Sequence, residues 1–182
     1  MKENKIYPYL KTKPEIDDTV FLAPGVKIVG DVKIKAGSSI WYNTVIRGDV
    51  NHIRIGENTN VQDLSMLHVT FEKYPLIIGN DVTIGHSVTL HGCILEDRTF
   101  IGMGATILDG AVIESNSMVA AGALVKQGYI VPSGKLVAGV PAKIIRDLTI
   151  DEINNIADSA KRYKKYAELT LKSLKVTDDL WN

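Results

Sequence analysis

Branched aliphatic residues recur at every sixth position over most of this chain, and this period limits the possible folds more than any other feature. The pattern begins at Ile16 and continues, with three interruptions, to Val125. Small or β-branched residues stand four places after the aliphatic ones, as Val20 does after Ile16. A hexapeptide period is typical of a parallel β-helix, in which each hexad forms one short strand and its corner. Stacked coils then bury a continuous core.

The predicted fold is therefore an all-β solenoid. Three hexads close one triangular coil, so equivalent positions stack every eighteen residues. We expect an extended segment over residues 1–15, where Pro8 and Pro14 disfavour a helix. The β-helix is predicted over residues 16–147, with regular hexads up to Val125.

The period changes near the end of the chain. Thr149 and Glu152 form a capping box, which opens a helix at Ile150. Apolar residues then recur at helical spacing, so we expect an α-helix over 148–175 that packs against the side of the β-helix. Residues 176–182 are predicted to form a tail.

The composition limits the classes of function. Lys and Arg number 21, and so do Asp and Glu, so no net charge favours a nucleic acid or an acidic membrane surface. The single cysteine, Cys93, excludes an internal disulfide and suits a reducing compartment. We find no apolar core of a signal peptide and no run long enough to span a bilayer. A cytoplasmic protein that binds neither nucleic acid nor membrane is expected.

The three interruptions lie around the histidines. The first lengthens the spacing near Gly48, and the second predicts a loop over residues 69–75. The third removes one residue, next to His91. If the extra residues bulge outwards, Arg47, His68 and His91 follow the aliphatics of one face in three successive coils.

Stacked strands lie about 4.8 Å apart. Two imidazoles at that separation, on His68 and His91, can share one metal ion at Zn–N distances of about 2.0–2.1 Å. His86 belongs to another face, one coil above Asp63, and a prism edge separates it from the pair. A neighbouring prism around a threefold axis would supply its own His86, since heterologous contacts close into rings. His52 is interpreted as a surface residue.

Three histidines with an open fourth position form a catalytic zinc pattern. Seven segments also carry a resemblance to known proteins. They are Arg47-Gly-Asp49, Asn60-Val-Gln-Asp63, His68, Ile84-Gly-His86, Leu90-His91-Gly-Cys93, Ile101-Gly-Met-Gly-Ala105 and Ala138-Gly-Val-Pro-Ala-Lys143. Together they resemble the gamma-class carbonic anhydrase family over nearly the whole chain. The hexapeptide period alone is less specific, because many acyltransferases share it.

The resemblance implies a left-handed β-helix and a homotrimer. It implies one Zn²⁺ (or Fe²⁺ or Co²⁺) at each subunit interface, with His68 and His91 from one chain and His86 from the next. The implied activity is the lyase reaction that hydrates CO2 to bicarbonate.

The resemblance also implies roles for four further residues. Gln62 would orient the reacting water, and Arg47 and Asp63 would form an ion pair between subunits. Asp49 would help to fix the interface. The proton route departs from the family's best-studied type, because the loop over 69–75 is short and offers only Glu72 as an acid. A valine also follows Asp49, where that type has a glutamate, so slow turnover is expected.

Two residues near the site receive structural interpretations. Tyr163 on the helix is interpreted as a packing residue. Cys93 is interpreted as a small apolar residue rather than a metal neighbour or a redox switch.

Two alternative functions stay open from the sequence. One is an acyl-CoA transferase or a metal-dependent thioesterase, because the segment from Ala138 to Lys143 resembles those of hexapeptide transferases. Such acetyltransferases need one catalytic histidine and a cleft for pantetheine, which leaves the three histidines unexplained. The other is a non-catalytic scaffold subunit in a larger assembly. Intact histidines argue against loss of the metal but not against loss of activity.

Overall fold

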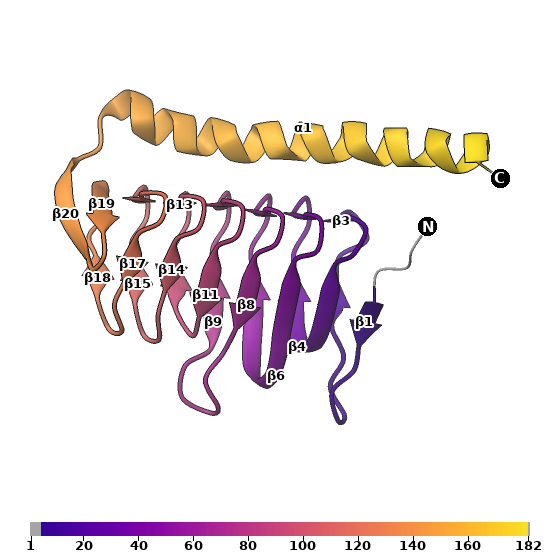
Figure 1. The fold of residues 1–182 in the computed structure, drawn as a ribbon, viewed down its shortest axis with the longest axis horizontal. Coiled ribbons are helices and arrows are strands. Elements are labelled where there is room, and N and C mark those ends of the chain that lie inside the picture. Colours follow the sequence, from indigo (N-terminus) through magenta and orange to yellow (C-terminus); the bar gives the residue numbers. More distant parts are fainter. Residues whose placement is uncertain (1–4, 182) are drawn as a thin grey trace.

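In the computed structural model, the described residues, 5–181, form a left-handed parallel β-solenoid of about seven turns with one long helix along its side (Figure 1). Side chains are described for residues 6–175. The aliphatic residues of the hexads lie in the strands and point into the prism, where Ile28, Ile84 and Leu90 are fully buried. Complete burial of such a side chain stabilises the fold by about 1.5–3 kcal/mol.

Residues with the same phase in the repeat share a face. The first face carries the two predicted ligands, His68 and His91, at the ends of its strands. Its strands are β1 (Lys5–Tyr7), β4 (Lys27–Ile34), β6 (Val45–Ile55), β8 (Met66–His68), β11 (Thr89–His91), β14 (Thr106–Ile107) and β17 (Leu124–Val125).

The second face begins where β4 and β6 bend around a corner of the prism. β6 pairs with β8 through Val45 and Ile46, and with β9 through Ile53 to Ile55. The three extra residues near Gly48 therefore lie in one long bent strand. The other strands of this face are β2 (Glu15–Ile16), β9 (Leu76–Ile78), β12 (Ile94–Leu95), β15 (Val112–Ile113) and β18 (Ile130–Val131).

The third face lies beneath the helix, which contacts its early strands. Its strands are β3 (Phe21–Leu22), β5 (Ser39–Ile40), β7 (Asn60–Val61), β10 (Thr83–Ile84), β13 (Phe100–Ile101), β16 (Met118–Val119), β19 (Lys135–Gly139) and β20 (Ala142–Asp147). All of these pairs are parallel except the last, in which β20 runs antiparallel to β19.

Strands continue through the whole range predicted for the β-helix, and the first of them lies before it. The hexads continue beyond Val125, because Val131 and Val137 are fully buried at the ends or centres of further strands. Gly128, Pro132 and Gly134 therefore lie at corners of the solenoid, within the range of 16–147 predicted for it. At the N-terminus, β1 already pairs with β4 within the segment expected to precede the β-helix.

The helix α1 (Ile150–Trp181) begins at the predicted capping box. The Thr149 amide donates to the Glu152 carboxylate at 2.9 Å, and the Glu152 amide donates to the Thr149 hydroxyl at 3.2 Å. The helix continues through Trp181, so the boundary expected at residue 175 is too early. In residues 5–181, no helix has both the length and the apolarity that crossing a membrane requires.

Aromatic packing attaches the helix to the first coils. Trp41 is buried between Phe21 and Tyr163, with ring centroids 5.3 and 5.5 Å away, and Tyr163 meets it edge-on. The apolar side of the helix adds Ile156, Ala160 and Ala167 to the buried surface. Tyr163 is therefore a packing residue, as the sequence indicated.

We expect Ile101→Ala to lower the free energy of unfolding by about 2–5 kcal/mol, because it leaves a cavity in the fully buried prism. The matched control is Ile130→Ala, whose side chain is 56 % exposed; it should change the stability by less than about 0.5 kcal/mol. Chemical denaturation at one fixed protein concentration measures both. Equal losses in the two variants would contradict the assignment of the core.

The start of α1 also carries a titratable ion pair. Two hydrogen bonds from Arg146, at 2.7 and 2.8 Å, together with the Thr149 amide, hold the pKa of Glu152 at about 2. Because this lies below the ordinary value of 4.5, the stabilisation is present above about pH 4.5 and is lost as the pH falls towards 2.

We therefore expect Arg146→Ala to raise the pKa of Glu152 towards 4.5, as measured by carbon-13 NMR of its carboxyl group. Lys161→Ala is the control, since Lys161 pairs with Asp158 elsewhere on the helix. An unchanged pKa in Arg146→Ala would show that this arginine does not hold the carboxylate.

Candidate metal centre

The strand register places His68 directly beside His91. β8 and β11 pair Leu67 with Leu90 and His68 with His91. The Nδ1 atom of His68 lies 3.1 Å from the Nε2 atom of His91, and the ring centroids are 5.1 Å apart. The stacking predicted from the hexads is thus confirmed.

A carboxylate contacts the remaining nitrogen of each ring. The Nε2 atom of His68 lies 3.1 Å from Oδ1 of Asp49, and the Nδ1 atom of His91 lies 2.7 Å from Oδ1 of Asp109. An ionised carboxylate only accepts hydrogen bonds, so these two nitrogens carry the protons. The two nitrogens that face each other are left without protons, which is the form that can bind a metal ion.

This arrangement fits a transition-metal ion. Two nitrogen ligands of a tetrahedral zinc ion, at about 2.0–2.1 Å from it, are about 3.3–3.4 Å apart. The observed 3.1 Å between His68 and His91 needs only a small adjustment. Carboxylates on the outer nitrogens are also the usual partners of metal-binding histidines.

Burial and a neighbouring ion pair set the charge states of Asp49 and His68. Arg47 forms an ion pair with Asp49. Burial opposes ionisation of Asp49, but hydrogen bonds from Arg47 and His68 outweigh it and lower the pKa of this carboxyl. Burial also lowers the pKa of His68, against the opposing effect of Asp49. A neutral imidazole is the form that binds metals.

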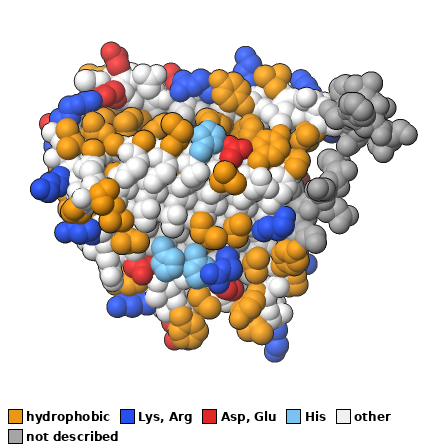
Figure 2. Space-filling model, viewed as in Figure 1, with side chains coloured by type: hydrophobic (Ala, Val, Ile, Leu, Met, Phe, Trp, Pro, Cys, Tyr) orange, Lys and Arg blue, Asp and Glu red, His pale blue; other side chains and the backbone are white. Residues whose placement is uncertain are grey.

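His86 lies on the opposite edge of the first face. Its Nδ1 atom is 2.7 Å from Oδ2 of Asp63, as expected for residues one coil apart. Figure 2 shows two neighbouring histidines near one edge and a third, next to an acidic side chain, near the other edge under the helix. In residues 5–181 of one chain, no group of three or more His, Cys, Asp or Glu side chains is arranged to hold a metal ion.

Gln62 lies on the same edge as His86, away from the histidine pair of its own chain. It is buried, and its amide donates to Asn60 at 3.1 Å. Asn60 in turn donates to Thr83 at 2.9 Å, and Thr83 donates to Ser159 of α1 at 3.1 Å. The predicted residues therefore form two groups in one chain. Arg47, Asp49, His68 and His91 make one group, and Gln62, Asp63 and His86 make the other.

A small pocket of about 370 Å³ adjoins His86. Aromatic side chains of the helix and the first coils line it, including Tyr42, Tyr163 and Tyr166. Burial, and then the nearby Asp63, raise the pKa of Tyr163. His52 is half-buried and borders a separate groove together with Asp49.

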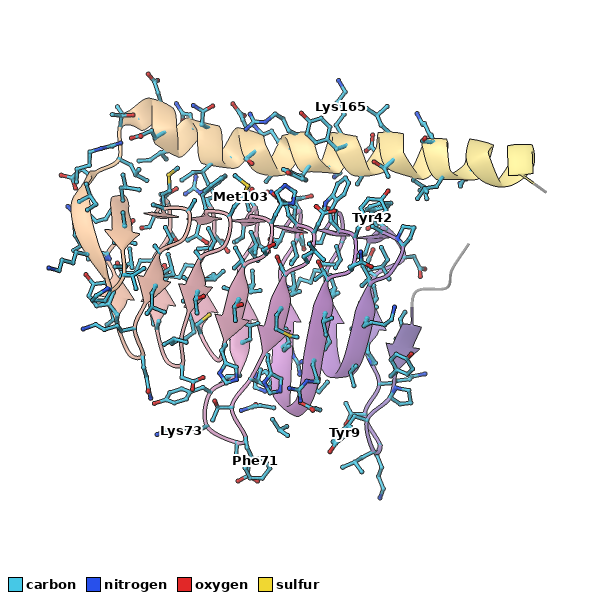
Figure 3. All side chains as sticks on the ribbon, in the orientation of Figure 1. Tyr9, Tyr42, Phe71, Lys73, Met103 and Lys165 are labelled. Atoms are coloured by element: carbon cyan, nitrogen blue, oxygen red, sulfur yellow. The ribbon has the colours of Figure 1, made fainter. Side chains whose placement is uncertain are left out.

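The structure also bears on two further predictions from the sequence, those for Cys93 and for the loop over residues 69–75. Cys93 is fully buried in the core, and burial raises the pKa of its thiol far above the ordinary value, so it is an inert apolar residue. The loop after β8 protrudes from Thr70 to Tyr74, which form an isolated bridge, whereas Val69 is buried. Figure 3 shows Phe71 on this loop, directed away from the solenoid.

Asp109 was not among the residues predicted from the sequence. Its position eighteen residues after His91, one coil further on, is a signal that was available in the hexad count.

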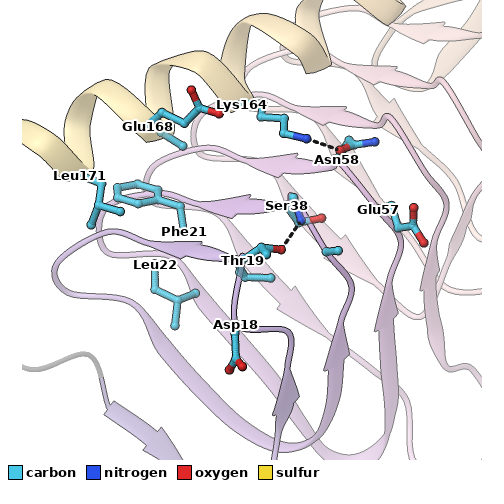
Figure 4. A pocket seen from close by; sticks show the side chains of 14 residues that line it. Asp18, Thr19, Phe21, Leu22, Ser38, Glu57, Asn58, Lys164, Glu168 and Leu171 are labelled. Atoms are coloured by element: carbon cyan, nitrogen blue, oxygen red, sulfur yellow. Dashed lines mark hydrogen bonds between the residues drawn. The ribbon is translucent and has the colours of Figure 1, made fainter.

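A larger groove of about 1000 Å³ lies elsewhere, between α1 and the first coils (Figure 4). Lys164 spans part of it and donates to Asn58 at 3.4 Å, but no histidine lines it.

Comparisons with known proteins identify the family. "Probable carbonic anhydrase" of Methanocaldococcus jannaschii is 53 % identical over 160 residues, which cover 88 % of this chain and 99 % of that protein. "Carbonic anhydrase" of Geobacillus kaustophilus is 49 % identical over 158 residues, with coverage of 87 % and 86 %. "Gamma carbonic anhydrase 1, mitochondrial" of Arabidopsis thaliana is 52 % identical over 160 residues. The chain belongs to the gamma-class carbonic anhydrase family.

The match to the plant gamma carbonic anhydrase covers 85 % of this chain but 58 % of that protein. Two repeat models also match, "Bacterial transferase hexapeptide (six repeats)" over residues 92–127 and "Hexapeptide repeat of succinyl-transferase" over residues 75–107. Among solved structures, a putative acetyltransferase of Bacillus cereus superposes with a TM-score of 0.90 at 45 % identity. That superposition covers 94 % of this chain and 98 % of the other.

We expect Asp49→Asn to lower the pKa of His68 further in the metal-free protein, because the Asp49 carboxylate opposes the effect of burial. Nitrogen-15 NMR of the imidazole measures this titration. Asp97→Asn, at a carboxylate that contacts Asn80, is the control and should leave His68 unchanged. A higher pKa in Asp49→Asn would contradict the arrangement described above.

Proposed function

We propose that this chain hydrates CO2 to bicarbonate at metal sites shared between the subunits of a homotrimer. One observation carries the proposal: the histidine set is divided between two edges of one face. His68 and His91 converge at one edge, and His86 stands at the other with its own carboxylate partner. Each edge supplies what the other lacks, so two copies side by side complete a three-histidine site.

The surface between the two edges supports this assembly. Leu64 and Met66 lie in the chain between Asp63 and His68, and they are 63 % and 40 % exposed. Met103 is 57 % exposed in the next coil after His86. Apolar side chains exposed together on one face are typical of an interface between protein chains.

The residues of the site would hold Zn²⁺, or Fe²⁺ or Co²⁺ with the same donors. When bound, such an ion lowers the pKa of its water to about 7 and so supplies hydroxide at neutral pH. The chain's own residues orient the reactants. We propose that Gln62, carried next to His86, positions the reacting oxygen by a hydrogen bond, and that Asp49 and Asp63 orient His68 and His86.

We propose that Arg47 joins the two subunits. Its side chain is partly exposed and already contacts Asp49, which leaves further donors of the guanidinium for Asp63 of the neighbouring chain.

Proton release is the weak step, because Glu72 is the one acid of the loop from Thr70 to Tyr74. We therefore propose slow turnover. A cytoplasmic location, expected from the single cysteine, stays a prediction.

Stopped-flow CO2 hydration by protein loaded anaerobically with Zn²⁺ or Fe²⁺ tests the proposal. We expect measurable activity in the wild type and a loss of at least about 100-fold in His91→Ala and in His86→Ala, because each removes a ligand. Hydrolysis of acetyl-CoA is the parallel assay. Activity towards the thioester alone would replace the proposal with the thioesterase alternative.

Mixed trimers test the division of the site. A trimer that contains both His86→Ala and His91→Ala chains holds one interface with all three histidines. Random mixing in equal amounts should therefore restore about a quarter of the wild-type activity, although each parent is inactive. No restoration in trimers shown to be mixed would contradict a site shared between chains.

A further inference from the structure

We infer that Asp109 is a positioning residue for the metal ligand His91, and that the loop from Thr70 to Tyr74 holds Asp109 in place. This inference rests on the proposed metal site and assigns a purpose to a loop that is short and poor in acids.

The side chains of Asp109 and His91 are in direct contact. Oδ1 of Asp109 accepts a hydrogen bond from Nδ1 of His91 at 2.7 Å, a short distance for such a bond. With the proton on Nδ1, the lone pair of His91 is on Nε2, the atom that faces His68 at 3.1 Å. Asp109 thus selects both the tautomer and the direction of the ring.

Two further hydrogen bonds hold Asp109 in place. The hydroxyl of Thr70 donates to the same Oδ1 atom at 2.9 Å. The backbone of Asp109 is also fixed, because its carbonyl accepts from the Gly128 amide at 2.9 Å. The backbone of Asp109 is therefore held by the next coil, and its carboxylate by the loop of an earlier coil.

The chain leaves space for this carboxylate at Gly92. Gly92 has a positive φ of 55°, and a Cβ atom there would lie 2.4 Å from Oδ1 of Asp109 and 2.7 Å from Cβ of Tyr74. Its amide donates to the His68 carbonyl at 3.0 Å, so its backbone is fixed in place. Only glycine lets Asp109 reach past this position to His91.

The loop from Thr70 to Tyr74 is itself held by hydrogen bonds and by packing. The Thr70 amide donates to the Tyr74 carbonyl at 3.1 Å, and the Asn51 side chain donates to the Thr70 carbonyl at 3.1 Å. The ring of Tyr74 also lies against Gly110, where a Cβ atom would come within 2.9 Å of it. The loop is thus attached to β6 through Asn51, and it packs against the residue that follows Asp109.

Zinc affinity of the trimer, measured by competition with a chromogenic chelator, tests the inference without an activity assay. We expect Asp109→Ala to weaken Zn²⁺ binding about 10–100-fold, the usual effect of losing such a partner. Asp109→Asn keeps an acceptor for Nδ1 and should lose less than about tenfold. Thr70→Val should fall between the wild type and Asp109→Ala. The visible spectrum of bound Co²⁺ should change in Asp109→Ala, because the ligand is reoriented.

Asp97→Ala is the matched control, since Asp97 also bonds across coils but contacts Asn80 and no histidine. It should keep the wild-type affinity. Wild-type affinity and spectrum in folded Asp109→Ala, or an equal loss in Asp97→Ala, would overturn the positioning role and leave the proposed function standing. An equal loss in Asp109→Asn and Asp109→Ala would also overturn it. A wild-type trimer that binds no Zn²⁺ would overturn both proposals.

Discussion

The stacking of one aliphatic side chain upon another, coil after coil, is the constraint on which the rest of this structure depends. In a parallel ladder a slip of one residue would turn every side chain to the opposite face. Leu67 pairs with Leu90 because both must point into the prism, and the residues that follow them must then point outwards together. The histidine pair is therefore a consequence of how the core packs.

Because packing of the core fixes the register, much of the site could be predicted from the sequence. The pairing of His68 with His91, and of His86 with Asp63, follows from counting positions in a repeat that tolerates insertions only at its corners. The start of the helix followed from a local capping motif. Each of these features is set by neighbours in the chain or by fixed steps along the repeat.

Other features depend on side-chain geometry, which a repeat does not encode. The hexad count places Asp109 one coil after His91, but their contact also needs the space left at Gly92 and the hydroxyl of Thr70. The bonds from Gln62 through Asn60 to the helix join residues that no motif connects.

The antiparallel strand β20 has a consequence for how copies of this chain can associate. A parallel solenoid ends in an open row of backbone donors and acceptors, which can template another coil from a second molecule. Here β20 occupies that row on the third face in the opposite direction, so an incoming coil would not find the register of the repeat. Growth along the solenoid axis is thereby discouraged at this end. This covered end is compatible with the association through the sides of the prism that we propose.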